Sequence, residues 1–289
     1  MFPVLGTDDL TQRKRSPYIA RFRGTHSQPM HVLGDYAYKV LGYRKIAMIS
    51  MDYIFGWESA GGFHRVFEES GGKIVQKLWC PITTQDFSPY LAQIRRDVDA
   101  VWALMAGRLA IMLIKQYEDY GLKGKIPLIG TGIMTEEAQL PAMGDEALGV
   151  ITVHHYSAAL DNPLNKEFVK KYRAKYGRVP SYYSETSYVG MRAINQAVTA
   201  LKGDVRNPDK VMKAFRAVEV QGAPRGPIKM DSYGSAIENY YIRKVERVGG
   251  ELQNSVIYTY PNVSQFWTYK PEEYLKLPVY SRDYPPLKP

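Results

Sequence analysis

The stretch "KIAMISMDYIFGWESAGGFHRVFEESGGKIVQKLWC" (residues 45–80) decides the fold class. It opens with an apolar run (45–51) and closes with a second one (73–80), and each run predicts a buried strand. Between them, residues 58–72 form a helical pattern that ends in a pair of glycines. A strand, a helix and a strand in this order make up the unit from which parallel sheets are built. The stretch therefore predicts an α/β fold with a mostly parallel sheet.

The same alternation extends to both sides of this unit. A helix is expected before it, over residues 31–42, and further strands are expected after it, over 100–105 and 126–131, with a helix over 109–122 between them. A mostly parallel sheet covered by helices accounts for these segments.

The pattern changes after residue 157. Three helices are expected with no strand between them, over residues 162–177, 182–203 and 207–219, the last with Asn207 as its N-terminal cap. We therefore expect them to pack in a different lobe. Residues 226–231 and 238–246 predict a β-hairpin, and an irregular tail rich in Tyr and Pro should follow it.

Length and composition exclude several classes of protein. A chain of 289 residues with 45% apolar side chains suits two cores, because single cores tend to split beyond roughly 250 residues. The net charge of +9 is spread without a run of four Lys or Arg, so we expect no nucleic-acid partner. The chain contains no run of 18 apolar residues, so no membrane span is predicted. Cys80 is the only cysteine and ends an apolar strand, which predicts a buried, inert thiol.

Motifs for catalysis, metals or cofactors are weak. "GTGIMT" (130–135) follows a predicted strand but lacks the third glycine and the acidic residue of a dinucleotide-binding loop. His154 and His155 are neighbours on a predicted strand, so their side chains should point to opposite faces and cannot share a metal. His64 is expected to face solvent. We expect no catalytic residue, no metal and no cofactor.

The ends of the predicted strands are rich in Gly, Thr and aromatic residues. They read "GTDD" (6–9), "DYIFGWE" (52–58), "MAGR" (105–108) and "GTGIM" (130–134). Ligands of open α/β sheets bind beyond the carboxyl ends of the strands. With few bases or nucleophiles, these segments suit holding a small molecule better than transforming it. In the second of them, we expect Glu58 to begin a helix whose amino terminus it complements.

Five segments, taken in order, resemble the solute-binding proteins of ABC importers in the leucine/isoleucine/valine-binding class. They are residues 6–29, 45–63, 99–132, 179–198 and 225–236. The resemblance covers essentially the whole chain. It implies the type I periplasmic-binding fold, in which two lobes with parallel sheets flanked by helices close on a ligand about a hinge. It also implies a periplasmic, monomeric protein that is not an enzyme, with a small-molecule ligand and an ABC permease of the inner membrane as its partners.

The resemblance further predicts how the chain is divided. Crossovers between the lobes are expected near residues 21–24, 152–157 and 226–231. One lobe would then contain residues 1–24 and 153–225, and the other residues 25–152 and 226–289. Family members usually carry a leader and further residues before the position of Met1. On this basis we expect an N-terminally truncated chain with an incomplete first lobe.

Ligand contacts can be carried over residue by residue. Thr7 is expected to meet the polar head of the ligand, Gly6 to let the backbone approach closely, and Phe55 to cap the ligand from the second lobe. The other expected contacts are Gly107, Arg108, Gly132 and Tyr183.

One departure from the family pattern bears on the ligand. Amino-acid binders of this class tend to carry an acid after the strand that is "PLIG" here, where this chain has Thr131, Gly132 and Ile133. An ammonium buried without a partner costs several kcal/mol, which disfavours free branched-chain amino acids. Arg108 and the aromatic walls favour an organic acid, an amide or an aromatic compound. A ligand-sensing receptor or regulator domain of the same fold is one alternative, and an α/β dehydrogenase is another.

Overall fold

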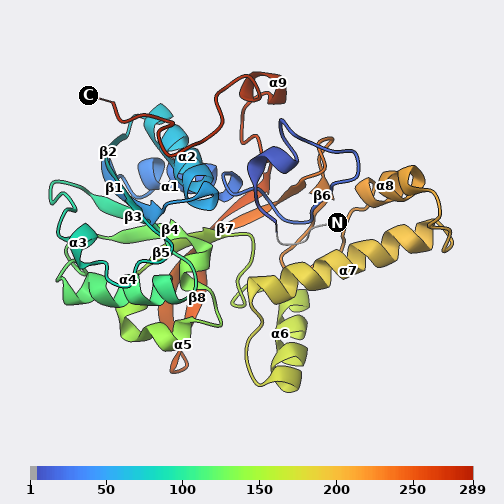
Figure 1. Cartoon of the computed structure of the whole chain (residues 1–289). Helices are drawn as coiled ribbons and strands as arrows, with labels where there is room; N and C mark the ends of the chain where they lie inside the picture. The colour runs from blue at the N-terminus through green and yellow to red at the C-terminus, as the bar shows by residue number, and fades with distance from the viewer. Residues whose placement is uncertain (1–4, 289) are drawn as a thin grey trace.

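The computed structural model describes residues 5–288 and is built around one sheet of eight strands (Figure 1). In chain order the strands are β1 (Lys45–Met51), β2 (Lys73–Cys80), β3 (Ala100–Leu104), β4 (Leu128–Thr131), β5 (Ile151–His154), β6 (Lys229–Met230), β7 (Ala236–Val248) and β8 (Glu251–Val263). Across the sheet they follow the order β2-β1-β3-β4-β5-β7-β6, and β8 pairs with β7.

The sheet is mostly parallel and is covered on both faces. Strands β1 to β5 run parallel to one another, whereas β7 is antiparallel to β5, β6 and β8. Helices α1 (Gln28–Lys39) and α2 (Ile54–Glu69) lie on one face, and α4 (Arg108–Asp119) and α5 (Leu140–Met143) lie on the other (Figure 1). This cover explains why every residue of β1 after Lys45 is buried and why the strand reads as a continuous apolar run. The predicted α/β fold class is confirmed.

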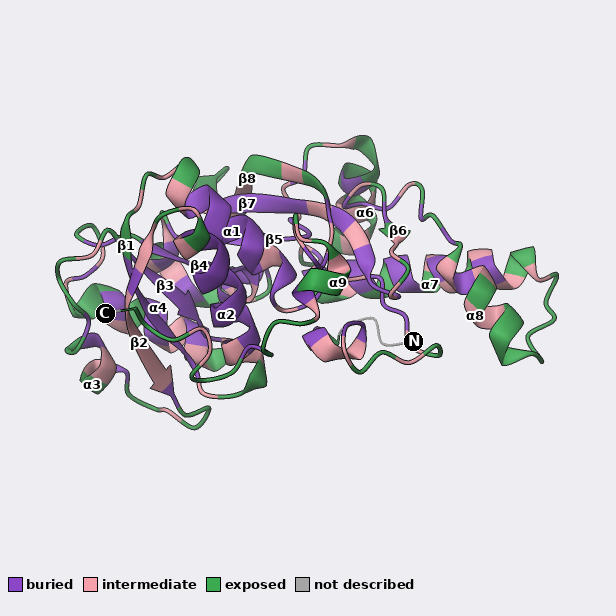
Figure 2. Ribbon diagram, turned by 90° about the horizontal axis from the view of Figure 1, so that it is seen from above, coloured by how far each residue is buried: buried purple, intermediate pink, exposed green. Residues whose placement is uncertain are grey.

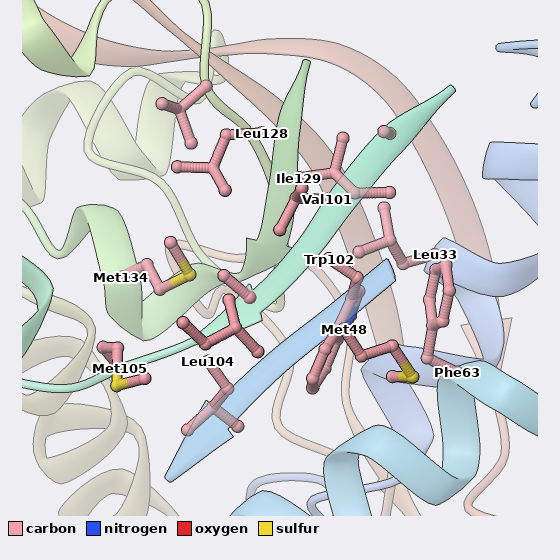
Figure 3. Close-up of a cluster of buried hydrophobic side chains, with 14 of the residues drawn as sticks. Leu33, Met48, Phe63, Val101, Trp102, Leu104, Met105, Leu128, Ile129 and Met134 are labelled. Atoms are coloured by element: carbon pink, nitrogen blue, oxygen red, sulfur yellow. The ribbon is translucent and has the colours of Figure 1, made fainter. Parts of the chain in front are cut away.

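The largest hydrophobic cluster among the described residues lies within this sheet and its helices, and we call it the sheet core. It draws its buried side chains from residues 30–153 and 240–263. Trp102 of β3 stands at its centre with Met48 of β1 and Phe63 of α2 (Figure 3), and the ring centroids of Phe63 and Trp102 are 5.7 Å apart. Burying these large apolar side chains away from water stabilises the sheet whose strand ends line the cavity described below.

Three helices form the second part of the molecule, and each begins with a side-chain cap. They are α6 (Pro163–Tyr176), α7 (Tyr182–Ala200) and α8 (Pro208–Arg216). The side chains of Asn162, Ser181 and Asn207 accept hydrogen bonds from the backbone three residues later. The predicted cap at Asn207 is thereby confirmed. Figure 2 shows much exposed surface on α8 and on the far end of α7.

The second core, called the helical core here, lies against α7 and α8. Its buried members are Ala20, Phe22, Val189, Ala193, Ala197, Phe215, Val218, Val220, Ala223, Ile228 and Ala236. Most of these members fall within residues 1–24 and 153–225, the segments expected to form the first lobe. Residues 1–4 of that expected lobe lie outside the described residues. Ile228 and Ala236 had been assigned to the other lobe, and Val153 packs in the sheet core instead. The third passage of the chain between the cores thus runs along the first residues of β7.

The C-terminal part contains one strand that the sequence did not predict. The hairpin of β6 and β7 is present, but β7 continues through Gly249 and Gly250 into a second, longer hairpin with β8. Both glycines have a positive φ, of 58° and 85°, as a tight turn between antiparallel strands requires. Beyond β8 the tail is irregular apart from α9 (Pro271–Tyr274), as predicted. It packs Tyr280 against Gly61 of α2, where a Cβ atom would lie 2.3 Å from the Tyr280 ring.

Two expectations about α2 are wrong. The helix begins at Ile54 with Tyr53 as its cap, so Glu58 lies beyond its first turn and is buried, and does not complement the amino terminus. His64 does not face solvent, because the helix is covered on the side that carries it, and its Nε2 lies 3.1 Å from the Glu68 carboxylate. Cys80 is buried, and this burial raises the pKa of its thiol to about 12, as expected for an inert group.

Candidate ligand-binding site

A cavity of about 360 Å³ lies where the sheet core meets the amino terminus of α7. Its walls come from residues 5–7, from the stretch 23–30 before and within α1, from the start of α2, from the ends of β4 and β5, and from Tyr182 and Tyr183. These segments converge because the carboxyl ends of parallel strands meet at one edge of a sheet. The volume is within the range of small-molecule sites.

Aromatic rings line the cavity on its α2 side and on its α7 side. On the α2 side, Phe55 packs against His26 with ring centroids 4.4 Å apart and against Tyr53 at 6.1 Å. On the α7 side, the Tyr182 ring lies 3.9 Å from Tyr183 and 4.3 Å from His154. Such walls suit a flat apolar body, since aromatic pairs gain from stacked and edge-to-face contacts.

The Lys, Arg, Asp and Glu side chains that line the cavity have one sign of charge. Among the described residues that line it, Arg23 is the single Lys or Arg, and there is no Asp or Glu. The Arg23 guanidinium lies 5.9 Å from the centroid of the Tyr182 ring. Thr7, Thr25 and Thr131 add hydroxyl groups to the lining. A carboxylate would therefore find a cation and donors here, whereas an ammonium would find no acidic partner.

A buried acid supports one wall from behind. Glu58 Oε2 lies 2.6 Å from His26 Nδ1, and Glu58 Oε1 accepts the backbone N–H of Asp8 at 3.2 Å. Burial and the neighbouring Asp8 raise the pKa of Glu58 well above its usual range, and burial lowers the pKa of His26. The His26 imidazole is thus neutral near pH 7 and held in one orientation.

The end of β4 is fixed by a buried arginine. Arg243 Nη2 donates to the Gly132 carbonyl at 2.8 Å, and its Nη1 lies 3.1 Å from Glu137 Oε1. At Gly132 a Cβ atom would lie 2.4 Å from His154 Cδ2, so only glycine fits between this histidine and the arginine. Gly132 begins a 3-10 turn of four residues, which offers no helix terminus for a dinucleotide pyrophosphate.

His154 and His155 do not point to opposite faces as expected. Their ring centroids are 4.3 Å apart, because β5 ends at His154 and the chain bends after it. His154 lines the cavity, and His155 Nε2 lies 3.0 Å from Thr186 Oγ1 on α7. Burial lowers the pKa of both imidazoles, which keeps them neutral. In residues 5–288 no group of three or more His, Cys, Asp or Glu side chains is placed to hold a metal.

Five of the seven predicted ligand contacts line the cavity. They are Gly6, Thr7, Phe55, Gly132 and Tyr183. Gly107 and Arg108 are not among the lining residues: the chain turns at Gly107, with φ +59°, and Arg108 begins α4 on the exposed surface. Their neighbour Ala106 takes their place at the wall. Ligand contact by any of these residues stays a prediction.

Several lining residues were missed from the sequence. Arg23 and His26 lie in "RFRGTH" at the first expected crossover, where a charged and a titratable residue beside Gly24 could have indicated the cavity. Tyr53, in the same segment as Phe55, and Tyr182, beside Tyr183, also line the cavity without having been predicted to do so. Nothing in the sequence indicated that His154 and Tyr182 would meet, because they belong to different parts of the fold.

Comparison with known proteins decides the family. The model of the family described as "Periplasmic binding protein" matches residues 2–251. The chain belongs to this family. Among curated relatives, Leu/Ile/Val-binding protein homolog 6 of Brucella melitensis is 32% identical over 253 residues, which cover 85% of this chain and 64% of the relative. The chain therefore spans less than two thirds of that relative's length.

Solved structures of the family agree in fold. An ABC transporter substrate-binding protein from Sphaerobacter thermophilus is 34% identical with a TM-score of 0.86, covering 90% of this chain and 72% of that one. A solute-binding protein of an ABC transporter from Rhodopseudomonas palustris, solved in complex with 3,4-dihydroxybenzoic acid, is also 34% identical. Its TM-score is 0.83, over 90% of this chain and 71% of that one. These relatives are binding proteins, and the predicted recognition of the family is confirmed.

Proposed function

We propose that this family member is the solute-binding component of an ABC importer and that it captures a small aromatic carboxylate. The observation that carries the proposal is the lining of the cavity, with Arg23 as its single cation, no Asp or Glu, and two aromatic walls. The aromatic acid in the related Rhodopseudomonas palustris protein supports the same ligand class.

Free leucine, isoleucine and valine fit this lining poorly. Each brings an ammonium as well as a carboxylate, and an ammonium enclosed without an acidic partner costs several kcal/mol. The absence of Asp and Glu from the described cavity walls thus favours an acid without an amino group.

In the proposed mechanism the ligand is held between the strand ends of the sheet and the start of α7. Closure about the crossovers then presents the closed form to a permease in the inner membrane. The site would act in the periplasm and carry out no reaction. No described helix has the length and hydropathy that a bilayer span requires. A sensor domain of the same fold would use the same cavity, and permease and ATPase genes beside this one would favour transport.

A thermal-shift screen tests the ligand class. The purified protein is heated with benzoate, 3,4-dihydroxybenzoate, benzamide, leucine or NAD. A ligand that binds only the folded state raises the melting temperature, by an amount set by its concentration relative to Kd. We expect a rise with the two acids and none with leucine or NAD. A rise with leucine alone would reject the aromatic carboxylate, and a rise with NAD would favour a dehydrogenase.

A further inference from the structure

His26 lines the cavity, and a buried acid engages one of its two ring nitrogens. Nδ1 is engaged by Glu58 Oε2 at 2.6 Å, and the backbone N–H of His26 donates to the Gly6 carbonyl at 2.7 Å. The ring packs on Phe55, with centroids 4.4 Å apart. The orientation of the ring is fixed by these contacts, and Nε2 is the nitrogen left to face a ligand.

The two oxygens of Glu58 have different partners. Oε1 accepts the backbone N–H of Asp8, so a proton on the carboxyl group belongs on Oε2, beside His26. The surroundings favour that proton, because Glu58 is buried next to the buried carboxyl group of Asp8. The charge of buried Arg21 acts against that proton, but its guanidinium donates to the carbonyls of Leu5 and Thr7 and has no hydrogen bond to Glu58.

The protonated carboxyl group decides which tautomer His26 adopts. A hydroxyl at Oε2 donates to Nδ1, and a neutral imidazole that accepts at Nδ1 carries its hydrogen on Nε2. Arg23 and Arg21 both oppose a positive charge on this ring. The ring therefore presents a neutral N–H donor to the cavity.

We propose that Glu58 is a positioning residue that holds His26 in the Nε2–H tautomer, so that His26 donates a hydrogen bond to the carboxylate of the bound aromatic acid. The inference rests on the proposed function, because it requires an anionic ligand. Arg23 supplies the charge, and His26 supplies direction, since a fixed N–H selects where the carboxylate oxygen lies. Gly6 keeps Nε2 open, as a Cβ atom at this position would lie 2.4 Å from it.

Three variants separate this role from simple packing. Glu58→Gln mimics the protonated acid, because its amide oxygen can accept the Asp8 N–H while its NH₂ group donates to His26 Nδ1. Glu58→Leu removes the donor, and His26→Phe keeps the ring stack on Phe55 but removes Nε2. The affinity for benzoate, measured by calorimetry at pH 7, should stay within about threefold in Glu58→Gln and fall about tenfold or more in the other two.

Proton counting gives a second readout on the unaltered protein. Benzoate binding measured in two buffers of different ionisation enthalpy should show no net proton uptake. Uptake of about one proton would mean that an imidazolium forms, and a loss in Glu58→Gln as large as in Glu58→Leu would mean that Glu58 acts as a carboxylate. Either result overturns the inference while leaving benzoate binding intact. If the unaltered protein does not bind benzoate, the proposed function fails and this inference fails with it.

Discussion

Arg225 and Glu185 form an ion pair of 2.6 Å in which both side chains are fully buried. Arg225 also lies 3.0 Å from Glu238 of β7 and donates to the carbonyl of Phe22. One guanidinium therefore joins α7 to the segment around Phe22 and to the start of β7, which are two of the three chain segments that pass between the sheet core and the helical core. Its position fits the hinge that the proposed mechanism needs.

Loss of this arginine should destabilise the fold strongly. Arg225→Met leaves two buried carboxyl groups without their cation, and we expect the free energy of unfolding to fall by about 3–5 kcal/mol. Arg173→Met is the matched control, because Arg173 pairs with Glu251 on the surface and should contribute no more than about 1 kcal/mol. Denaturant unfolding of both variants measures the difference. Equal losses would show that the buried cluster has no special role.

Arg23 should account for the preference for an acid. Arg23→Gln removes the cation from the cavity wall, and a hydrogen bond to a charged group is worth about 1.5–3 kcal/mol, so the affinity for benzoate should fall by about tenfold to a hundredfold. Arg108→Gln is the control, since Arg108 is exposed at the start of α4 and does not line the cavity. Should Arg108→Gln lose the affinity instead, the ligand would bind nearer to α4.

Phe55 should contribute as an aromatic wall. Phe55→Ala removes one ring from the stack with His26 and Tyr53, and we expect the affinity for benzoate to fall by about tenfold without loss of the folded state. Tyr120→Ala, at an exposed aromatic outside the cavity, should leave the affinity unchanged. Circular dichroism confirms folding in each case. An unchanged affinity in Phe55→Ala would remove this ring from the site.

The pH dependence of stability tests the protonation of Glu58. Because its pKa is raised in the folded state, this carboxyl group keeps a proton that the unfolded chain releases as the pH rises above about 4.5. Its contribution to the free energy of unfolding is thus fully present at low pH and declines as the pH rises, by at most about 1.4 kcal/mol per pH unit. Glu58→Gln has no carboxyl group to titrate here. The free energy of unfolding of the variant should therefore rise relative to that of the unaltered protein between pH 6 and pH 9. Parallel curves of unfolding free energy over that range would speak against a protonated Glu58.

Local patterns predicted the layers of this fold well. The apolar run of β1 and the glycine pair after α2 were enough to predict a parallel sheet, because burial on both faces leaves a continuous apolar signal. The strand β8 was not predicted because "ELQNSVIYTYPNV" has no apolar run of four or more residues, and its pairing depends on β7 beside it. Gly249 and Gly250 were the available signal for that hairpin.

The site was harder to predict than the fold, since its residues meet only in three dimensions. Phe55 and Gly132 follow strands and could be placed at the cavity in advance, whereas Arg23 and His26 lie in a crossover whose path no local pattern sets. Arg108 follows a predicted strand and was expected at the ligand for that reason. The chain turns at Gly107, which has a positive φ, and α4 begins at the next residue. Arg108 therefore lies on the surface.

The central claim is that the cavity selects an aromatic carboxylate. Calorimetric titration of the purified protein with benzoate, benzamide and L-leucine tests it directly, because the three ligands separate the acid, the ring and the ammonium. The account predicts saturable binding of benzoate, binding of benzamide weaker by tenfold or more, and no heat of binding with leucine. Tight binding of leucine together with no heat of binding from benzoate would contradict it.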